Sequence, residues 1–308
     1  MTLEQYMPRA AGRLADLFER LDPVFAEVWT THQQRLLSRT QLDQRTRMLV
    51  MTSQYTVTRM HEPLGENLEA AIEAGVDPTH LLEAILQCYV YTGTWIVATA
   101  CEVFESVMAR HPDAARSNPT ADMNAGRNLE AERSTWSATD ASDVRVDRII
   151  ETYGWHGFSN GLRLRPGHHI NLVDTLDALD PDYLRAWLDA VYDGMYGRGV
   201  LDDRTRLLCV VGATLALGEK HQSRRHMRAA LRAGAAPTEV LEVAFSTTAI
   251  FGHPHVMPAV FDDLIRILDD EGRISELIAA DRIDSIRAIV AARVARREGV
   301  QDDISETR

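Results

Sequence analysis

One segment of the sequence concentrates side chains that do acid–base chemistry. Residues 219–234 read EKHQSRRHMRAALRAG and directly follow an apolar run, LLCVVGATLALG, at residues 207–218. Glu219, Gln222 and His226 are spaced i, i+3 and i+7, so a helix places them on one face. A carboxylate, an amide and an imidazole on one face can bind a carbonyl group, hold water and deliver a proton to carbon.

The elements that must position this face occur twice along the chain. LDQRTRML at residues 42–49 recurs as LDDRTRLL at residues 201–208, and further matches follow at the same offset of 159 residues. Upstream, LDPVFAEVW at residues 21–29 recurs as LDPDYLRAW at residues 179–187. The repeated unit is far longer than a solenoid repeat. The sequence therefore predicts two fused copies of one helical domain.

Each copy reads as a set of helices, which makes the predicted fold all-α. The apolar runs after residues 42 and 201 are typical of buried helices. Gly75 predicts a helix end, and Asp77 with Pro78 predicts the start of the next helix. We expect a first unit at residues 1–116, a linker at 117–174 and a second unit at 175–308.

The linker carries few helix signals. Residues 117–143 are rich in Ser, Thr, Asn, Asp and Ala, which predicts a loop with a short helix near Leu129. GWHGFSNGLRLRPGHH at residues 154–169 has four glycines, three histidines and no helical period. It is either an active-site loop, able to roof a pocket, or a solvated turn.

Bulk composition narrows the class of protein. The net charge of −12, from 45 acidic and 33 basic residues, disfavours a nucleic-acid partner. Residues 84–101 approach the length of a membrane span but contain Gln, Gly and Thr, so we expect a buried hairpin and no membrane partner. The N-terminus lacks the apolar core of a signal peptide. Together these features predict a cytoplasmic protein, with Cys88, Cys101 and Cys209 as buried free thiols.

The second unit resembles the carboxymuconolactone decarboxylase family, whose superfamily also includes the AhpD-like alkylhydroperoxidases. The resemblance is strongest along LDDRTRLL and EKHQSRRHMRAALRAGAAPTEVLEVAFSTTAIFGHP. It implies an all-helical fold and a homo-oligomer, with a trimer favoured. The residues that carry it are Leu201–Arg206, His226, Ala229–Leu231, Gly234, Glu239, Glu242, Val243, Phe251, Gly252 and Pro254.

The chain departs from the peroxidase branch of that superfamily. Glu219 and Gln222 stand where a C-x-x-C pair precedes the helix histidine, so the nucleophilic thiolate of a peroxidase is missing. In the first copy, Asn67 stands at the position of His226. We therefore expect the second copy to carry the chemistry and the first to be degenerate.

The residues predicted to act fall into two groups. His226, Glu219 and Gln222 are the catalytic candidates, with His226 as general acid or base. Glu242 has a second interpretation, a structural ion pair with Arg204, because both recur in the first copy. Arg225, with Arg228 and Arg232, has the alternative of a solvated stripe that pairs with Glu219 and Glu239. The substrate-binding candidates are His253, His255, Arg206, Arg225 and Glu242.

The predicted function is a cofactor-independent decarboxylase or related lyase that acts on a small anionic or lactone-like organic acid. No metal is expected, because the chain has no H-x-x-x-H or H-E-x-x-H motif. Two alternatives stay open: a scaffold or binding protein that has lost catalysis, and a biosynthetic isomerase or cyclase for a larger natural product.

Overall fold

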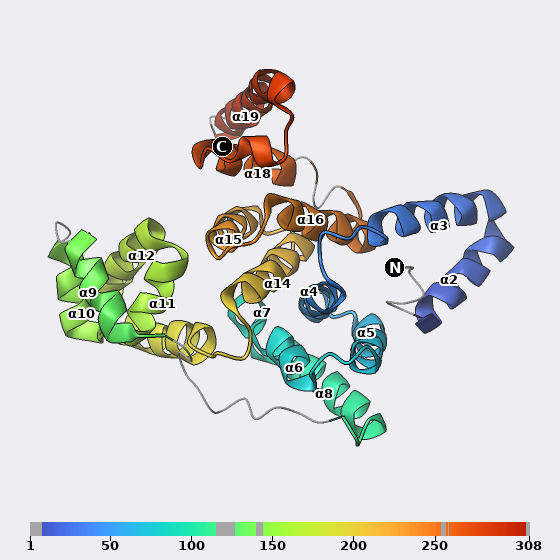
Figure 1. The fold of residues 1–308 in the computed structure, drawn as a ribbon, viewed down its shortest axis with the longest axis horizontal. Helices are drawn as coiled ribbons and strands as arrows, with labels where there is room; N and C mark the ends of the chain where they lie inside the picture. The colour runs from blue at the N-terminus through green and yellow to red at the C-terminus, as the bar shows by residue number, and fades with distance from the viewer. Residues whose placement is uncertain (1–7, 115–126, 140–143, 254–256, 258, 306–308) are drawn as a thin grey trace.

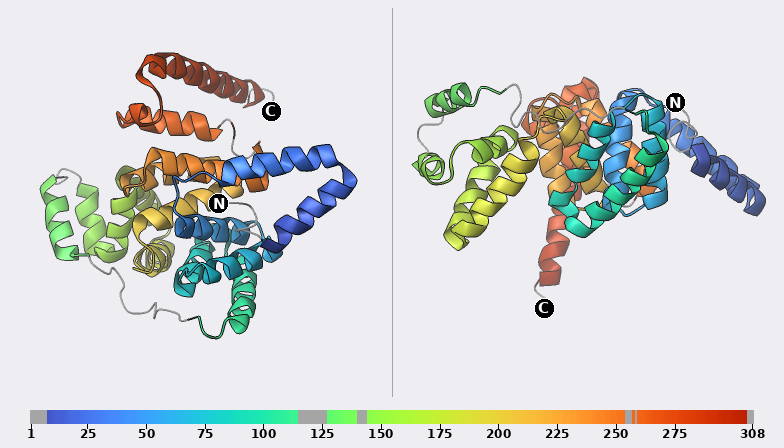
Figure 2. Two further views of the ribbon diagram at one scale, coloured as in Figure 1. Left: turned by 45° about the vertical axis from the view of Figure 1, so that its right-hand side comes forward. Right: turned by 90° about the horizontal axis from the view of Figure 1, so that it is seen from below.

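The computed structural model describes residues 8–114, 127–139, 144–253, 257 and 259–305. Within these ranges the protein is built of helices and has no β-strand, which confirms the all-α prediction. A lobe formed by α9–α12 and a hairpin formed by α2 and α3 lie at opposite sides of a central helical body (Figures 1 and 2). None of the described helices combines the length and the apolar character of a membrane span.

In the first half, the helix boundaries follow the signals in the sequence. Asp22, Asp43 and Asp77 cap α3, α4 and α6 by accepting hydrogen bonds from backbone N–H groups of the first turn. Gly75 and Gly93 adopt φ angles of 82° and 74° after α5 and α7. The elements are α2 (Pro8–Leu21), α3 (Pro23–Leu37), α4 (Gln44–Val57), α5 (His61–Glu73), α6 (Pro78–Leu86), α7 (Tyr89–Thr92) and α8 (Thr94–Arg110).

The second half has helices at corresponding positions. Asp180 and Asp202 cap α13 and α14, and Gly234 and Gly252 again have positive φ angles, of 92° and 85°. One element differs, because α13 continues into a π-helix, η1. The elements are α13 (Pro181–Trp187), η1 (Leu188–Tyr196), α14 (Asp203–Ala216), α15 (Lys220–Arg232), α16 (Pro237–Phe251) and α18 (Ala259–Asp270), followed by η2 (Ile274–Glu276), η3 (Ala280–Arg282) and α19 (Ile283–Ser305).

The core is centred on α4 and α14, which pack against each other and are buried along nearly their whole length. They come close at Gly212, where a Cβ atom would lie 2.7 Å from Cγ1 of Val50. A glycine at this position lets the two helix backbones approach, as a larger residue would not.

Two buried arginine–glutamate pairs join the halves across this seam. The Arg206 guanidinium donates to the Glu83 carboxylate at 2.7 Å, and the Arg47 guanidinium donates to Glu242. All four side chains are at most 1% exposed. Each pair takes its arginine from one half and its glutamate from the other, so the contact is reciprocal. Two copies of one domain would make this arrangement, although duplication itself stays a prediction from the sequence.

The predicted ion pair between Arg204 and Glu242 is wrong. Glu242 is taken up by Arg47 of the first half, and Arg204 pairs with Glu239 instead. The pairing crosses between the halves because α16, which carries Glu242, packs against both α14 and α4.

The prediction of a loop at residues 154–169 is also wrong. This segment forms one helix of the α9–α12 lobe and the first turn of the next, and the short helix expected near Leu129 is present as α9. Gly161 lies inside a helix, and this position requires glycine because a Cβ atom there would lie 2.1 Å from the His169 ring. Pro166 occupies the first turn of its helix, where no N–H donor is needed. The elements are α9 (Leu129–Thr139), α10 (Val144–Tyr153), α11 (His156–Leu164) and α12 (Pro166–Leu179).

The reciprocal pairs generate a stability prediction. Glu83→Gln and Glu242→Gln should each lower the free energy of unfolding by about 3–5 kcal/mol, because each leaves a buried guanidinium without its counter-charge. Urea unfolding followed by circular dichroism measures the change. Glu62→Gln, which breaks the exposed pair with Arg13, is the control and should change little. Equal effects of all three substitutions would contradict the structural role of the seam.

Candidate functional site

A cavity of about 460 Å³ lies where α7, α12, η1 and α15 meet. Its wall therefore comes from three parts of the chain: the first half, the α9–α12 lobe and the second half. The lining residues are Val90, Tyr91, Arg165, His168, Leu172, Trp187, Val191, Tyr192, Tyr196, Leu217, Glu219, Gln222, Arg225 and His226.

His226 is the buried imidazole of this cavity, at 1% exposure. Its Nε2 atom lies 3.0 Å from the hydroxyl oxygen of Tyr91, and its Nδ1 atom has no hydrogen-bond partner in the described structure. Burial lowers the pKa of His226 well below its ordinary value, and Arg165, Arg225 and His168 lower it further. His226 is therefore a neutral imidazole at neutral pH in the free protein.

Tyrosine hydroxyls extend the hydrogen-bonded chain away from His226. The hydroxyls of Tyr91 and Tyr196 are 2.7 Å apart, so Tyr91 links Tyr196 to the imidazole. Burial raises the pKa of Tyr91 well above 10, and burial raises that of Tyr192 to about 12. The hydroxyls of Tyr91 and Tyr192 therefore keep their protons at neutral pH and can act as hydrogen-bond donors.

Arg165 brings a positive charge into the same wall. Its guanidinium donates to the Tyr192 hydroxyl at 2.8 Å. No carboxylate among the described residues lies within ion-pair distance of it, although the side chain is only partly exposed. A partly buried cation without a counter-charge leaves room for an anion in the cavity.

The π-helix η1, together with Trp187 at the end of α13, supplies several ring side chains to the wall. A π-helix bonds residue i to i+5, which gives a wide turn of about 4.4 residues. Trp187 and Tyr196 are nine residues apart, so they share a face in this winding and would lie on opposite faces of an α-helix. Tyr192 lies between them and stacks with Tyr196 at a ring-centroid distance of 5.6 Å.

The structure brings together four of the residues singled out in the sequence. Glu219, Gln222 and His226 line this cavity, as their spacing on one helix face predicts, and Arg225 of the same helix lines it too. Glu219 occupies the N-cap position of α15, yet its side chain makes no capping hydrogen bond. Its side chain is exposed and, since it does not cap the helix, its carboxylate can contact a ligand.

Three of the other four substrate-binding candidates, Arg206, Glu242 and His253, are not among the residues that line this cavity. Arg206 and Glu242 form the buried ion pairs across the α4–α14 seam, with Glu83 and Arg47 as their partners. The His253 ring lies 5.2 Å from that of His32 on α3, away from the lining residues. His255 lies outside the described residues.

Sequence reasoning missed Tyr91, Tyr192, Tyr196 and Arg165. Arg165 and His168 belong to the histidine-rich segment considered as an active-site loop, which was the available signal. Tyr91 belongs to the copy regarded as degenerate, and nothing in a linear sequence shows that α7 contacts η1 of the other half.

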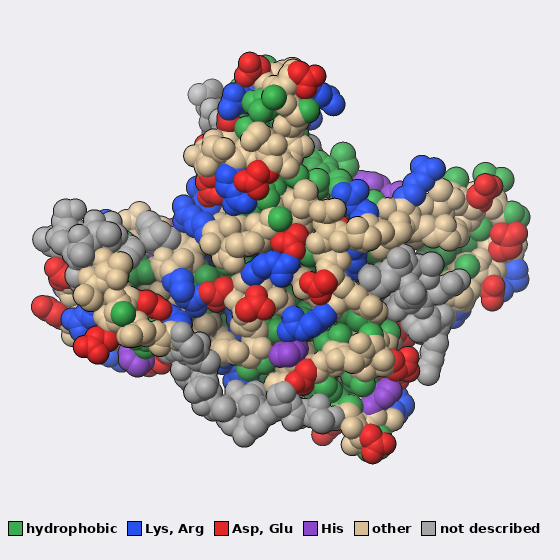
Figure 3. Space-filling view, in the orientation of Figure 1, with side chains coloured by type: hydrophobic (Ala, Val, Ile, Leu, Met, Phe, Trp, Pro, Cys, Tyr) green, Lys and Arg blue, Asp and Glu red, His purple; other side chains and the backbone are tan. Residues whose placement is uncertain are grey.

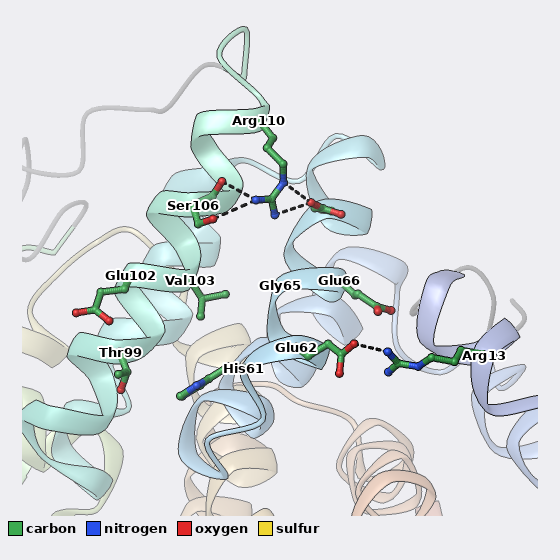
Figure 4. A pocket seen from close by; sticks show the side chains of 11 residues that line it. Arg13, His61, Glu62, Gly65, Glu66, Thr99, Glu102, Val103, Ser106 and Arg110 are labelled. Atoms are coloured by element: carbon green, nitrogen blue, oxygen red, sulfur yellow. Dashed lines mark hydrogen bonds and ion pairs between the residues drawn. The ribbon is translucent and has the colours of Figure 1, made fainter. Parts of the chain in front are cut away.

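A larger cavity, of about 590 Å³, lies between α2, α5 and α8 (Figure 4). Four glutamates line it, together with Arg13 and Arg110, which are paired with Glu62 and Glu69. No cluster of three or more metal-ligating side chains occurs among the described residues. This acidic cavity lacks the buried imidazole that distinguishes the smaller one.

Residues 181–262 match the model of the Carboxymuconolactone decarboxylase family. The match includes Glu219, Gln222, Arg225 and His226, and it favours a decarboxylase or a related activity. Tyr91 and Arg165 lie outside the matched stretch. No curated protein was found to match the chain.

The thiols give no support to peroxidase chemistry of the AhpD-like type. Cys88 and Cys209 are buried, Cys101 is partly buried, and all three are free. Burial raises the pKa of each thiol, so none is a ready thiolate. None of the three lines the cavity at His226.

The neutral state of His226 generates a pH prediction. Below pH about 6.5 the unfolded chain protonates this imidazole while the folded chain does not, so the unfolded state binds more protons. Stability should therefore fall as the pH drops from 7 to 5. His226→Gln should reduce that slope by up to about 1.4 kcal/mol per pH unit.

Urea unfolding at a series of pH values measures the slope. His221→Gln, an exposed histidine on the same helix, controls for the loss of an imidazole. An unchanged slope in His226→Gln would show that this side chain takes up protons equally in both states.

Proposed function

We propose that the chain is a cofactor-independent enzyme that decarboxylates, or rearranges through an enolate, a small anionic organic acid in the cavity at His226. The observation that carries the proposal is a buried neutral imidazole, hydrogen-bonded to a tyrosine, beside a guanidinium that has no carboxylate partner among the described residues. The family match of residues 181–262 supports the reaction class.

Arg165 stabilises the oxygen on which negative charge develops. In a decarboxylation the C–C bond to the leaving carboxylate breaks, CO2 departs, and the electron pair stays on the substrate as an enolate. A cation that held the leaving carboxylate would stabilise the ground state and would not increase the rate of decarboxylation. A cation and a donor at the enolate oxygen stabilise the transition state instead. Arg165, with the neighbouring tyrosine hydroxyls, fits that second role.

His226 and Tyr91 move the proton that completes the reaction. The enolate carbon must gain a proton to form the new C–H bond. A bound anion offsets the positive charges of Arg165 and Arg225, which lower the pKa of His226 in the free protein. His226 therefore gains a proton more readily once the substrate is bound, and it can then act as the acid.

Glu219, Gln222 and Arg225 orient the substrate at the open end of the cavity. Gln222 is partly exposed, and the other two are exposed. Their amide, carboxylate and guanidinium groups can bind carbonyl, hydroxyl and carboxylate groups of a ligand. An exposed rim around a buried imidazole admits the substrate and keeps the reacting end away from bulk water.

The test is an assay for carbon–carbon cleavage and proton exchange. Unsaturated γ-lactone carboxylic acids and 3-oxo acids, labelled with ¹³C in the carboxyl group, are incubated with the protein in D2O. NMR then follows ¹³CO2 release and deuterium incorporation. We expect turnover of at least one class, and a loss of about a hundredfold or more in His226→Gln.

Asn67→Ala is the matched control, because Asn67 occupies the position of His226 in the first half. Its side-chain amide donates to the Met48 carbonyl and the Thr52 hydroxyl inside the core. The substitution should cost about 1–3 kcal/mol of stability and leave the turnover of folded protein intact. Deuterium incorporation without CO2 release would identify an isomerase. Absence of both reactions across the panel would favour a scaffold protein.

A further inference from the structure

A second cavity, of about 420 Å³, adjoins the one at His226. Arg165, His168 and Arg225 line both cavities, so they form the junction between them. From the junction the second cavity follows α15 past the side chains of His221, Arg224, Arg228 and Arg232. Basic side chains gather where α15 faces the α9–α12 lobe in Figure 3.

Part of this positive charge is already matched by carboxylates. Arg228 pairs with Asp270 at 2.6 Å, Arg232 lies 3.8 Å from Glu271, and Arg224 lies 3.8 Å from Asp263. These partners lie on or just after α18, so the predicted pairing of the arginine stripe with Glu219 and Glu239 is wrong.

The two arginines at the junction are the unmatched ones. Neither Arg165 nor Arg225 has a carboxylate within ion-pair distance in the part of the chain that the structure describes. Arg165 precedes α12, and Arg225 belongs to α15, so the two guanidinium groups reach the junction from different elements. The side chain of His168 lies beside them.

The larger cavity in the first half, between α2, α5 and α8, is acidic instead. Figure 4 shows this cavity against α5, with Glu66 labelled on it; at the sequence offset of 159 residues, Glu66 and Glu69 align with Arg225 and Arg228 of α15. The shared helical architecture therefore does not impose a basic lining. The positive charge is specific to the half that contains His226.

We propose that this junction and the groove beyond it bind a phosphate or phosphonate group of the same molecule that reacts at His226, with Arg165 donating to this group from one edge of its guanidinium and to the enolate oxygen from another. The substrate class is then a phosphorylated organic acid. A tetrahedral dianion offers three oxygens in different directions, which suits guanidinium groups that arrive from different elements, whereas a planar carboxylate is satisfied by one fork. This inference rests on the proposed function for the reacting end of the substrate.

Binding tests the inference without any turnover. Isothermal titration calorimetry at pH 7 and constant ionic strength measures the affinity for inorganic phosphate. We expect saturable binding, weakened about tenfold or more in Arg225→Gln, since one charge-assisted hydrogen bond is lost. Arg287→Gln, which changes a surface arginine on α19, should bind phosphate as the unmodified protein does.

A series of linked probes tests whether one molecule spans both cavities. Phosphonoacetate, 3-phosphonopropionate and 4-phosphonobutanoate carry a carboxylate and a phosphonate at increasing separation. One of them should bind at least about tenfold more tightly than phosphate, because the second group binds at high effective concentration. That gain should be lost in Arg165→Gln as well as in Arg225→Gln.

Several results would overturn the inference. These are phosphate binding that is not saturable, affinity unaffected by Arg225→Gln, or equally tight binding of glutarate, which would identify a dicarboxylate site. Phosphate binding without any gain from the linked probes would show a free-anion site unconnected to His226. Failure of the proposed enzyme would appear differently, as intact phosphate binding with no reaction in the labelled-acid assay.

Discussion

The reciprocal arginine–glutamate pairs across the α4–α14 seam are the constraint on which the rest of the structure depends. A guanidinium buried at 0–1% exposure is tolerable only where a carboxylate and backbone carbonyls surround it. Arg206 must therefore meet Glu83, which belongs to the other half of the chain. Fixing that contact also fixes α6 and α7 against the second half, and so brings Tyr91 to His226.

The arginines at the seam and those at the cavity differ in their electrostatic partners. Those at the seam are neutralised by glutamates and serve the fold. Arg165 and Arg225 are not neutralised by protein carboxylates in the described chain, and their charge helps to hold His226 in its neutral state. A ligand anion that binds these two cations would offset their charge and so raise the pKa of His226. Substrate binding and the protonation of the catalytic group are coupled in this way.

The sequence predicted those features that local pattern determines. The spacing of Glu219, Gln222 and His226 places them on one face, and helix ends follow from local signals such as Gly75 and Asp77. Features that depend on contacts distant in sequence were not predicted. Gly161 reads as a loop residue until the His169 ring is seen to occupy the space of its missing side chain. Glu242 and Arg206 resemble binding residues because their partners lie in the opposite half.

The central claim is that the working cavity is built from both halves of the chain, and Tyr91→Phe tests it most directly. The substitution keeps the ring and removes the hydroxyl that bonds to His226 and Tyr196. The account predicts a fall in kcat of about a hundredfold for the folded protein, beside a loss of about 1–3 kcal/mol of stability because His226 and Tyr196 each lose a hydrogen-bond partner. Tyr89→Phe, two residues away and exposed, should leave kcat unaffected. Undiminished kcat in Tyr91→Phe, beside an inactive His226→Gln, would contradict the account and confine the site to the second half.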